Sequence, residues 1–277
     1  MRRRALVVCP GRGSYSREGL GQLKNRGAQV ADMLDVCDAF RAQNDRPTLR
    51  EIDGAETYRS NLHVAGENAS LLTFACTLAD FMSIDAERYE VVGVTGNSMG
   101  WYTALAASGA MSLEQAVELV DTMGAYQAGN VIGGQVLTPA CSESVVAGQL
   151  EDPAQVEAID AVLRACTDAG HVAVWSIRLG GYAVLGADKA GVKYLLEHLP
   201  HAQRGANVFP MQLPLHSAFH TSLLEATAAQ ARKDLSHLDY QPPVLPLIDG
   251  RGRVYRPFHA DPAELADYTL GHQVVAP

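Results

Sequence analysis

The sequence contains no paired cysteine motif, no excess of positive charge and no repeated or low-complexity segment, and each absence excludes a class of protein. Five cysteines are scattered over 277 residues without a C-x-x-C pair, which favours buried structural thiols in a reducing compartment over a disulfide framework. The formal net charge of −9 argues against a protein dedicated to binding nucleic acid. We expect neither a nucleic-acid partner nor a bound metal ion.

Long apolar runs are absent as well. The N-terminal stretch MRRRALVVCPGRGS has a basic start, but its apolar run, Ala5 to Cys9, is shorter than the apolar region of a signal peptide. No other stretch approaches the length of a membrane span. We therefore expect a cytoplasmic protein without a membrane partner.

The composition is otherwise that of a soluble globular protein, with 47% hydrophobic and 19% charged residues. A chain of 277 residues can bury a sizeable core as one large α/β domain or as a domain with an insert. Apolar strands alternate with helix-length segments in the first half of the chain, which predicts a parallel sheet. The expected strands are 5–9 and 89–94, and the expected helices are 69–84, 99–108 and 113–127, with a weakly patterned helical segment at 17–45.

The order of elements changes after this first half. Residues 133–213 have the order strand, helix, strand, strand, helix, strand, and the two middle strands meet at Gly180 and Gly181. This βαββαβ order is typical of ferredoxin-like modules. A helix at 223–235 and a strand followed by a glycine turn at 250–252 then return the chain to the first domain.

The predicted fold class is therefore α/β, with a hydrolase-like large domain around a parallel sheet and a smaller inserted subdomain. We assign residues 1–130 and 214–277 to the large domain, and residues 131–213 to the ferredoxin-like (βαββαβ) insert.

A serine lies between two glycines directly after the second predicted strand, in the stretch Gly96-Asn97-Ser98-Met99-Gly100. A strand-to-helix turn of the form G-x-S-x-G can expose a serine hydroxyl as a nucleophile. The backbone N–H of Met99, at the start of the next helix, can face a developing negative charge. The alternative is a structural turn in which Ser98 only caps the helix.

A serine nucleophile needs a base, and nine histidines are available. His220 lies in LPLHSAFHTSLL, after a predicted strand and just before a predicted helix, which suits a site at the edge of a sheet. His216 lies four residues earlier and is its nearest competitor. A histidine in a loop is often only a solvated polar group, so spacing alone leaves this choice open.

Four stretches, taken in order, resemble the malonyl-CoA:acyl-carrier-protein transacylases, the acyltransferase family of fatty-acid and polyketide synthesis. VVCPGRGSYS (7–16) is similar to the family's F-P-G-Q-G-S-Q turn, and GNSMG (96–100) to its G-H-S-x-G elbow. AFHTSLL (218–224) is similar to P-F-H-T-P-L-M, and LGHQVVAP (270–277) to the Q-L-x-x-P segment. The expected insert falls where the family has one, so the resemblance covers essentially the whole chain.

The resemblance implies an acyltransferase that works through a serine. Ser98 is then the acylated nucleophile and His220 its base. The backbone carbonyl of Gln273 orients His220, and the amides of Arg12 and Met99 form the oxyanion hole. The implied reaction is ping-pong: Ser98 attacks an acyl-CoA thioester, CoA leaves, and the phosphopantetheine thiol of an acyl-carrier protein takes the acyl group. Acyl-CoA and the carrier protein are the implied partners, and no cofactor is required.

Several residues depart from the family pattern around one expected acyl pocket. Met123 replaces the arginine that clamps the malonyl carboxylate, Asn97 replaces the histidine before the nucleophile, and Trp101 replaces the glutamate after the elbow. The insert's N-x-P-x-Q stretch has become IRLGG. Either the acyl group carries no carboxylate, or another arginine replaces the clamp, with Arg12 the first candidate and Arg178 the second.

Two further expectations follow from the resemblance. Family members continue beyond the Q-L-x-x-P segment, so we expect either a large domain that is truncated at its C-terminal end or one whose final sheet edge is supplied in another way. The same serine and histidine could also serve an editing hydrolase that clears acyl groups from a carrier protein or from CoA. The departures around the serine leave room for a third function, a non-catalytic relative that docks a carrier protein.

Overall fold

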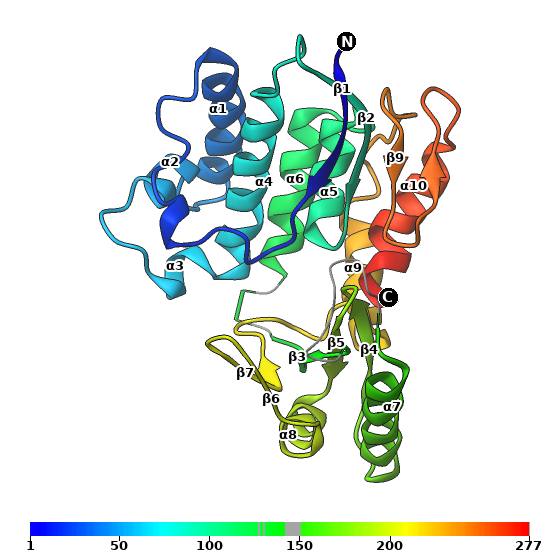
Figure 1. Ribbon diagram of the computed structural model, residues 1–277. Coiled ribbons are helices and arrows are strands. Elements are labelled where there is room, and N and C mark those ends of the chain that lie inside the picture. Colours follow the sequence, from blue (N-terminus) through cyan, green and yellow to red (C-terminus); the bar gives the residue numbers. More distant parts are fainter. Residues whose placement is uncertain (127, 130, 142–150, 277) are drawn as a thin grey trace. The chain divides into compact units, whose positions relative to one another are not determined.

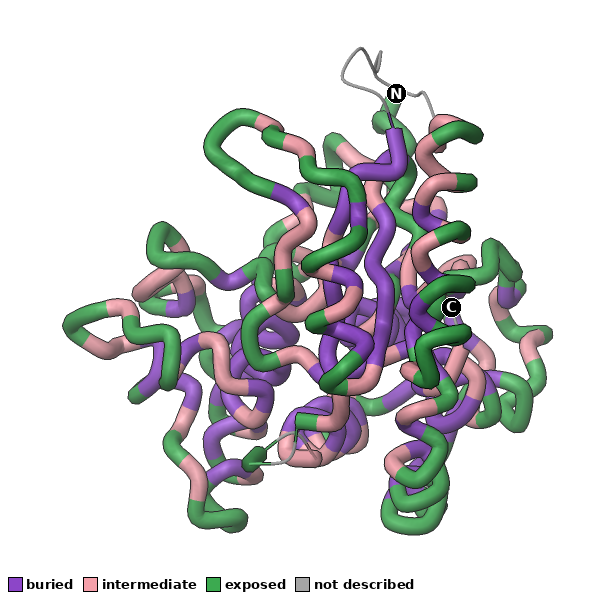
Figure 2. Tube along the Cα trace, turned by 90° about the horizontal axis from the view of Figure 1, so that it is seen from below, coloured by how far each residue is buried: buried purple, intermediate pink, exposed green. Residues whose placement is uncertain are grey.

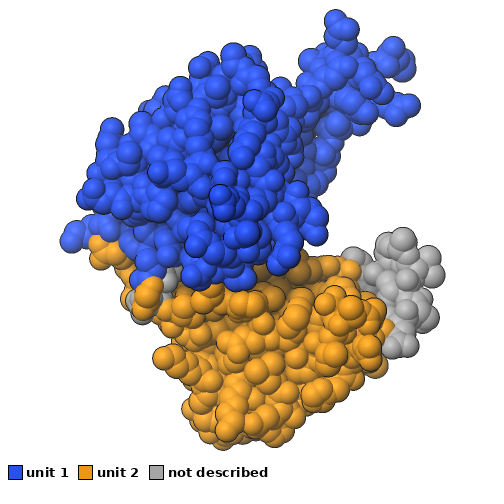
Figure 3. Space-filling view, turned by 90° about the vertical axis from the view of Figure 1, so that its left-hand side faces the viewer, with its two compact units in different colours: residues 1–128, 231–271 blue, residues 129–230, 272–277 orange. Residues whose placement is uncertain are grey.

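The computed structural model describes residues 1–126, 128–129, 131–141 and 151–276. The chain divides into two compact units (Figure 3), of which the first contains Met1–Ala128 and Ala231–Gly271. The second contains Gly129–Gln230 and His272–Pro277. This second unit is longer than the predicted insert, 131–213, because it also includes the residues up to Gln230 and the segment His272–Pro277.

Three positions with sequence predictions lie outside the described residues. They are residue 127, the end of the predicted helix 113–127, residue 130, the end of the first predicted domain segment, and residue 277, the proline of LGHQVVAP.

A four-stranded sheet forms the centre of the first unit, in the order β1-β2-β9-β10. Strands β1 (Arg3–Cys9), β2 (Tyr89–Gly96) and β9 (Leu247–Ile248) are parallel, and β10 (Val254–Tyr255) is antiparallel to β9. The register of β1 and β2 ends with Cys9 opposite Gly96. The predicted parallel sheet is confirmed, and its first two strands end side by side.

Helices pack on the parallel strands of the first unit, and α5 lies behind β1 in the view of Figure 1. Helix α5 packs against both strands, and α4 and α6 pack against α5. The predicted helical segment at 17–45 is helical at 17–19, a 3-10 turn, and at 28–43, an α-helix, and it is wrong for residues 20–27. The helical elements of this unit are η1 (Arg17–Gly19), α1 (Ala28–Gln43), α2 (Leu49–Asp53), α3 (Ser60–His63), α4 (Gly66–Met82), α5 (Met99–Ala107), α6 (Leu113–Ala125) and α10 (Pro262–Asp267).

Local sequence explains why α4 and α6 form where they do. The Ser112 hydroxyl accepts a hydrogen bond from the backbone N–H of Gln115 and so caps α6. The apolar residues of α6 recur at helical spacing and are buried. Helix α4 is buried over most of its length, as its nearly continuous apolar sequence predicts. Figure 2 shows such buried stretches in purple.

The second unit contains an antiparallel sheet in the order β4-β5-β3-β8. Its strands are β3 (Gly134–Pro139), β4 (Ala173–Arg178), β5 (Tyr182–Ala187) and β8 (Met211–Gln212), and its main helices are α7 (Pro153–Asp168) and α8 (Lys189–His198). Apolar side chains of both helices and of the sheet form one core cluster, which includes Val136, Ile159 and Leu185. The order β3-α7-β4-β5-α8-β8 confirms the ferredoxin-like pattern.

Two glycines and a proline shape the loops of this sheet. Gly180 and Gly181, with φ of 57° and 123°, connect β4 to β5 in a conformation that favours glycine. The last strand predicted for the insert, over residues 206–213, is interrupted at Pro210, which has no N–H to donate. Residues before the proline form β7 (Asn207–Phe209), which pairs with β6 (Ala202–Arg204) in a separate hairpin.

The remaining elements lead to the C-terminus. They are η2 (Ser222–Leu224), α9 (Glu225–Asp234), a single π-helical turn at Tyr268–His272 and α11 (Gln273–Val275). All five cysteines are buried free thiols, as expected. Among the described residues, no helix is both long and apolar enough to cross a membrane.

Candidate active site

Ser98 lies in a sharp turn between β2 and α5, in the first unit. Its backbone has φ 57° and ψ −129°, a left-handed conformation that a non-glycine residue rarely adopts. The glycines on either side are required by packing. A Cβ atom at Gly96 would collide with the carbonyl oxygen of Gly100, and one at Gly100 with that of Cys9. The G-x-S-x-G spacing therefore follows from how closely β1, β2 and α5 approach one another.

Ser98 does not serve as a helix cap. It occupies the N-cap position of α5, but its side chain makes no capping hydrogen bond. Instead, the side-chain oxygen of Asn97 accepts a hydrogen bond from the Ser98 N–H at 2.8 Å. Met99 is the first residue of α5, so its N–H points out of the helix without an intrahelical acceptor. These features disagree with the alternative of a capping serine, and the role of the half-buried Ser98 as a nucleophile stays a prediction.

The turn that carries Arg12 lies at the same edge of the sheet as Ser98. Both follow parallel strands that end in register, and parallel strands present their carboxyl ends on one edge. A Cβ atom at Gly11 would be in contact with the backbone oxygen of Asn97 at 3.8 Å. Burial lowers the pKa of Arg12 to about 10, while the nearby Glu67 acts in the opposite direction. Arg12 stays a cation at neutral pH.

Tyr15 fixes the far end of the same turn. Its hydroxyl donates to the carboxylate of Asp53 at 2.7 Å, and both side chains are buried. Asp53 also accepts from the N–H groups of Gly21 and Leu23, each at 3.1 Å. A buried carboxylate with three donors is well satisfied and rigid. The Arg12 turn is therefore held between strand β1 and a fixed anchor.

His220 lies in the second unit, and its backbone is also left-handed, with φ 57°. Its backbone N–H donates to the carbonyl of Val274 at 3.0 Å, and its ring Nδ1 is hydrogen-bonded to the carbonyl oxygen of Gln273. Because a carbonyl can only accept, Nδ1 carries the proton and Nε2 is the unprotonated nitrogen of the neutral ring. Burial lowers the pKa of His220 to about 4, and the Gln273 hydrogen bond opposes this only in part. The imidazole is therefore neutral at pH 7.

Two polar strand residues hold the peptide that precedes His220, and the sequence reasoning missed both. Gln135 of β3 donates to the hydroxyl of Ser176 of β4 at 2.7 Å, and Ser176 donates to the carbonyl of Phe219 at 2.8 Å. The available signal was a polar residue between apolar neighbours in each of two strands, Gln135 in GGQVLTP and Ser176 in VAVWSIRL. That signal does not tell which group the polar residue contacts.

Trp101 and Met123, the other two expected pocket residues, are buried within the first unit. Trp101 has no exposed surface; its indole N–H donates to the Thr269 hydroxyl at 2.9 Å, and its ring meets Tyr268 edge-on with centroids 4.8 Å apart. Met123 on α6 is 8% exposed. The neighbouring Gly124 packs against the first turn of α4, which also contains Glu67. Their role in acyl binding stays a prediction.

The competing candidates have other contacts. Arg178 is paired with Glu151, and its guanidinium lies 4.1 Å from the ring centroid of Trp175. The ring Nδ1 of His216 lies 2.8 Å from the carbonyl oxygen of Pro214. Among the described residues, no group of three His, Cys, Asp or Glu side chains could hold a metal ion.

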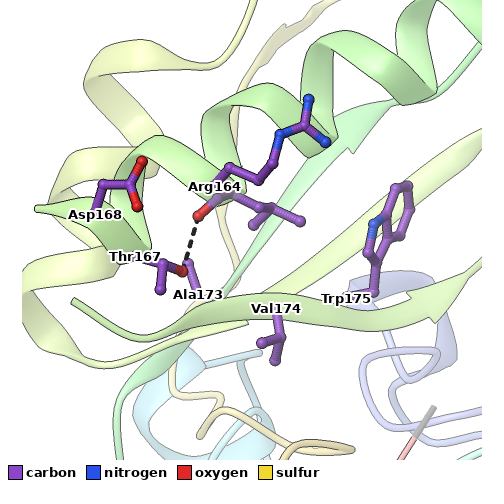
Figure 4. Close-up of a pocket in the computed structure, with 7 residues that line it drawn as sticks. Arg164, Thr167, Asp168, Ala173, Val174 and Trp175 are labelled. Atoms are coloured by element: carbon purple, nitrogen blue, oxygen red, sulfur yellow. Dashed lines mark hydrogen bonds between the residues drawn. The ribbon is translucent and has the colours of Figure 1, made fainter. Parts of the chain in front are cut away.

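Each unit also contains a cavity that is lined by none of the predicted site residues. In the second unit, a cavity of about 390 Å³ lies between α7 and β4 (Figure 4), with Arg164, Asp168 and Trp175 in its lining. In the first unit, a cavity of about 490 Å³ lies beside the start of α1, with Lys24, Arg26 and Arg50 in its lining. Both arginines there are already paired with aspartates.

Comparison with known proteins decides the fold. No protein-family model matches the sequence, and no curated protein sequence matches it. Solved structures do. A malonyl-CoA:acyl carrier protein transacylase from Xanthomonas oryzae is 23% identical, with a TM-score of 0.74 over 100% of this chain and 82% of its own. An acyl-carrier-protein S-malonyltransferase from Burkholderia pseudomallei is 22% identical, with a TM-score of 0.72 over 99% and 82%.

A third match comes from the complex of a type II PKS acyl-carrier protein with its malonyl-transacylase. It is 16% identical, with a TM-score of 0.74 over 99% of this chain and 82% of that one. The chain has the fold of the malonyl-CoA:acyl-carrier-protein transacylases. The transacylase fold contains both predicted parts, the parallel sheet of the first unit and the ferredoxin-like sheet of the second. Identities of this size establish the fold, and the roles of individual residues rest on their own geometry.

Proposed function

We propose that this protein is a serine acyltransferase, which moves an acyl group from CoA to an acyl-carrier protein through an acyl-Ser98 intermediate. The acyl group is either malonyl-type or without a carboxylate. The transacylase fold supports this chemistry, and the solved complex of a malonyl-transacylase with an acyl-carrier protein supports a carrier as the acceptor. We place the reaction in the cytoplasm, as part of fatty-acid or polyketide synthesis.

The observation that carries the proposal is the backbone of Ser98. A left-handed serine between two glycines that packing requires is costly, at about 1–3 kcal/mol, and such strain is found where a side chain must be presented for chemistry. The Met99 N–H at the start of α5 supplies one oxyanion donor, and the backbone amide of Arg12 supplies the second in our proposal.

His220 is suited to act as the base. Its ring is neutral at pH 7 and its Nδ1 is held by a backbone carbonyl, so Nε2 is the atom that accepts a proton. In the proposed first step the Ser98 oxygen attacks the thioester carbon and its proton passes to Nε2. The C–S bond then breaks, and the imidazolium returns the proton to the departing CoA thiolate. In the second step the carrier's phosphopantetheine thiol gives its proton to Nε2 and attacks the ester carbon, the C–O bond to Ser98 breaks, and the imidazolium returns the proton to the Ser98 oxygen.

A panel of acyl-CoA donors with intact-protein mass spectrometry tests the proposal. We expect an acyl adduct on the wild-type protein that a phosphopantetheinylated carrier protein discharges, with the acyl group recovered on the carrier. Ser98→Ala should show no adduct, and labelling that survives this change contradicts the assignment of Ser98. An adduct that decays in buffer without a carrier supports the editing hydrolase instead. Absence of any adduct with every donor supports the non-catalytic docking relative.

A further inference from the structure

A chain of three polar groups ends at the peptide that precedes His220. The side-chain amide of Gln135 donates to the Ser176 hydroxyl oxygen at 2.7 Å, which leaves the hydroxyl hydrogen to point onward. Ser176 donates that hydrogen to the Phe219 carbonyl at 2.8 Å, and Gln135 also reaches this carbonyl at 3.3 Å. The Phe219 carbonyl therefore accepts from two strands of the sheet, β3 and β4.

The two polar side chains of this hydrogen-bond series are buried, which is unusual for polar residues in strands. Gln135 is 2% exposed and Ser176 is fully buried. Burying an amide and a hydroxyl is unfavourable unless their hydrogen bonds are satisfied, so apolar residues would suit these positions better if packing were their only role. The hydrogen bonds that satisfy them are directed at one another and at Phe219.

A bulge in β4 brings Ser176 to this position. Trp175 pairs with Leu185 and Ile177 with Val184, so Ser176 is an extra residue opposite no partner of β5. Bulges of this kind redirect a side chain, and they are common beside functional sites. The irregular register thus has a local consequence, which is the hydrogen bond from Ser176 to Phe219.

We propose that Gln135 and Ser176 are positioning residues for His220, an inference that rests on the proposed function. The Phe219–His220 peptide is held on one side by Ser176 and on the other by the hydrogen bond from the His220 N–H to Val274. With both ends of the peptide fixed, His220 keeps its left-handed backbone and its ring stays on the Gln273 carbonyl. Loss of the Phe219 contact frees the peptide to rotate, and the ring then loses its fixed direction.

Rates of Ser98 acylation at saturating acyl-CoA provide the first test. We expect Ser176→Ala and Gln135→Met each to lower the rate constant about tenfold, the effect of one net hydrogen bond, with KM for acyl-CoA within about twofold of wild type. Ser176→Thr keeps the hydroxyl and should recover most of the rate. Because the two residues act in series, their effects should not add: the acylation rate constant of the double variant should lie within about twofold of that of Ser176→Ala.

A matched control comes from the same unit. Thr167 on α7 also donates its hydroxyl to a backbone carbonyl, that of Leu163 at 3.0 Å. Thr167→Val removes a comparable hydrogen bond far along the chain from His220 and should leave the acylation rate unchanged. Folded Ser176→Ala and Gln135→Met proteins that acylate at the wild-type rate overturn the proposal. If Ser176→Ala does not fold, Gln135→Met and Ser176→Thr carry the test.

A spectroscopic measurement separates this proposal from the proposed function. In protein with ¹⁵N-labelled histidine, the Nδ1–H signal of His220 is assigned by its loss in His220→Gln. We expect the exchange of this proton with water to become about tenfold faster in Ser176→Ala and in Gln135→Met, because the ring is held less firmly. This result stands even if no acyl-CoA labels the wild type, which would contradict only the proposed function. Equal exchange in wild type and both variants overturns the positioning role.

Discussion

The ring of His220 is hydrogen-bonded through Nδ1 to the backbone carbonyl oxygen of Gln273, a residue 53 positions later in the chain. A carbonyl cannot be protonated or change its charge, so this partner fixes the tautomer of the ring without stabilising an imidazolium as a carboxylate would. Burial therefore lowers the pKa of His220 to about 4, and the Gln273 hydrogen bond, which acts in the opposite direction, offsets this only in part.

The first prediction concerns the pH dependence of acylation. Only unprotonated Nε2 can accept the Ser98 proton, so the rate of acyl-Ser98 formation should be constant near neutral pH and should fall as pH decreases, with half the maximal rate near pH 4. Stopped-flow or quenched acylation in buffers between neutral pH and this midpoint measures it. A midpoint near the ordinary histidine value of about 6.5 would show that His220 is not the controlling base, or that it is solvated.

The second prediction concerns stability. The pKa of His220 is lowered to about 4 in the folded state from an ordinary value of 6.5. Between these two pH values, the histidine is protonated in the unfolded chain and neutral in the folded one. This contribution to stability is present above the unfolded pKa and is lost as pH falls through that window. We expect wild type to lose about 3 kcal/mol more unfolding free energy than His220→Gln between pH 7 and pH 4. Urea unfolding of both proteins measures this difference, and parallel pH profiles would contradict it.

The third prediction concerns the glycines beside Ser98. Gly96→Ala and Gly100→Ala would each push a methyl group into a backbone carbonyl. We expect each change to lower the unfolding free energy by about 1–3 kcal/mol and to abolish labelling of Ser98 by acyl-CoA. Gly19→Ala is the control, since its new methyl group meets first a flexible Gln22 amide at 3.3 Å. Thermal unfolding and mass spectrometry separate lost stability from lost reactivity.

Sequence patterns predict the parts of this fold that depend on neighbours along the chain. Apolar residues that recur at helical spacing predict α6, and two adjacent glycines between two apolar segments predict the β4–β5 hairpin. The π-helical turn at 268–272 was not predicted, because it is held by partners far away in sequence. One of these is Trp101, which bonds to Thr269 across 168 positions.

The candidate site likewise has residues that the sequence predicts and residues that only the fold reveals. The elbow around Ser98 is visible in a five-residue pattern, and the resemblance picks His220 from nine histidines. Gln135 and Ser176 were not predicted, because their function depends on how two strands of a sheet meet a loop. An isolated polar residue in an apolar strand indicates that a partner exists, and only the fold identifies Phe219 as that partner.

The fourth prediction concerns a buried ion pair in the first unit. Arg41 and Asp121 have no exposed side-chain surface and lie 2.8 Å apart, and Arg41 also donates to the carbonyl of Glu67. Removing Arg41 leaves Asp121 buried with Arg46 as its remaining cationic partner, so Arg41→Met should lower the unfolding free energy by about 3 kcal/mol, the lower end of the range for a broken buried pair. Arg164→Met breaks the exposed pair with Glu157 and should change it by less than about 1 kcal/mol. Similar losses in both variants would show that the Arg41 pair contributes no more than a surface pair.

The fifth prediction concerns the acyl group. Met123 is buried and uncharged, Arg178 is paired with Glu151, and the guanidinium of Arg12 lies within electrostatic range of Glu67. A carboxylate buried beside Met123 without a cationic partner is unfavourable by several kcal/mol. We therefore expect acetyl-CoA to label Ser98 at least about tenfold faster than malonyl-CoA. Competition between the two donors, read by mass spectrometry, measures this ratio.

Substitutions at two positions then decide between the two interpretations of the missing clamp. Met123→Arg supplies a guanidinium that can pair with a carboxylate in a bidentate manner, so it should shift the preference towards malonyl-CoA, whereas Met123→Leu keeps the apolar volume and should not. If wild type instead prefers malonyl-CoA and Arg12→Ala removes that preference while acetyl labelling persists, Arg12 is the replacement clamp. Malonyl labelling that is insensitive to both positions would place the carboxylate elsewhere, and Met123 would then be a packing residue of α6.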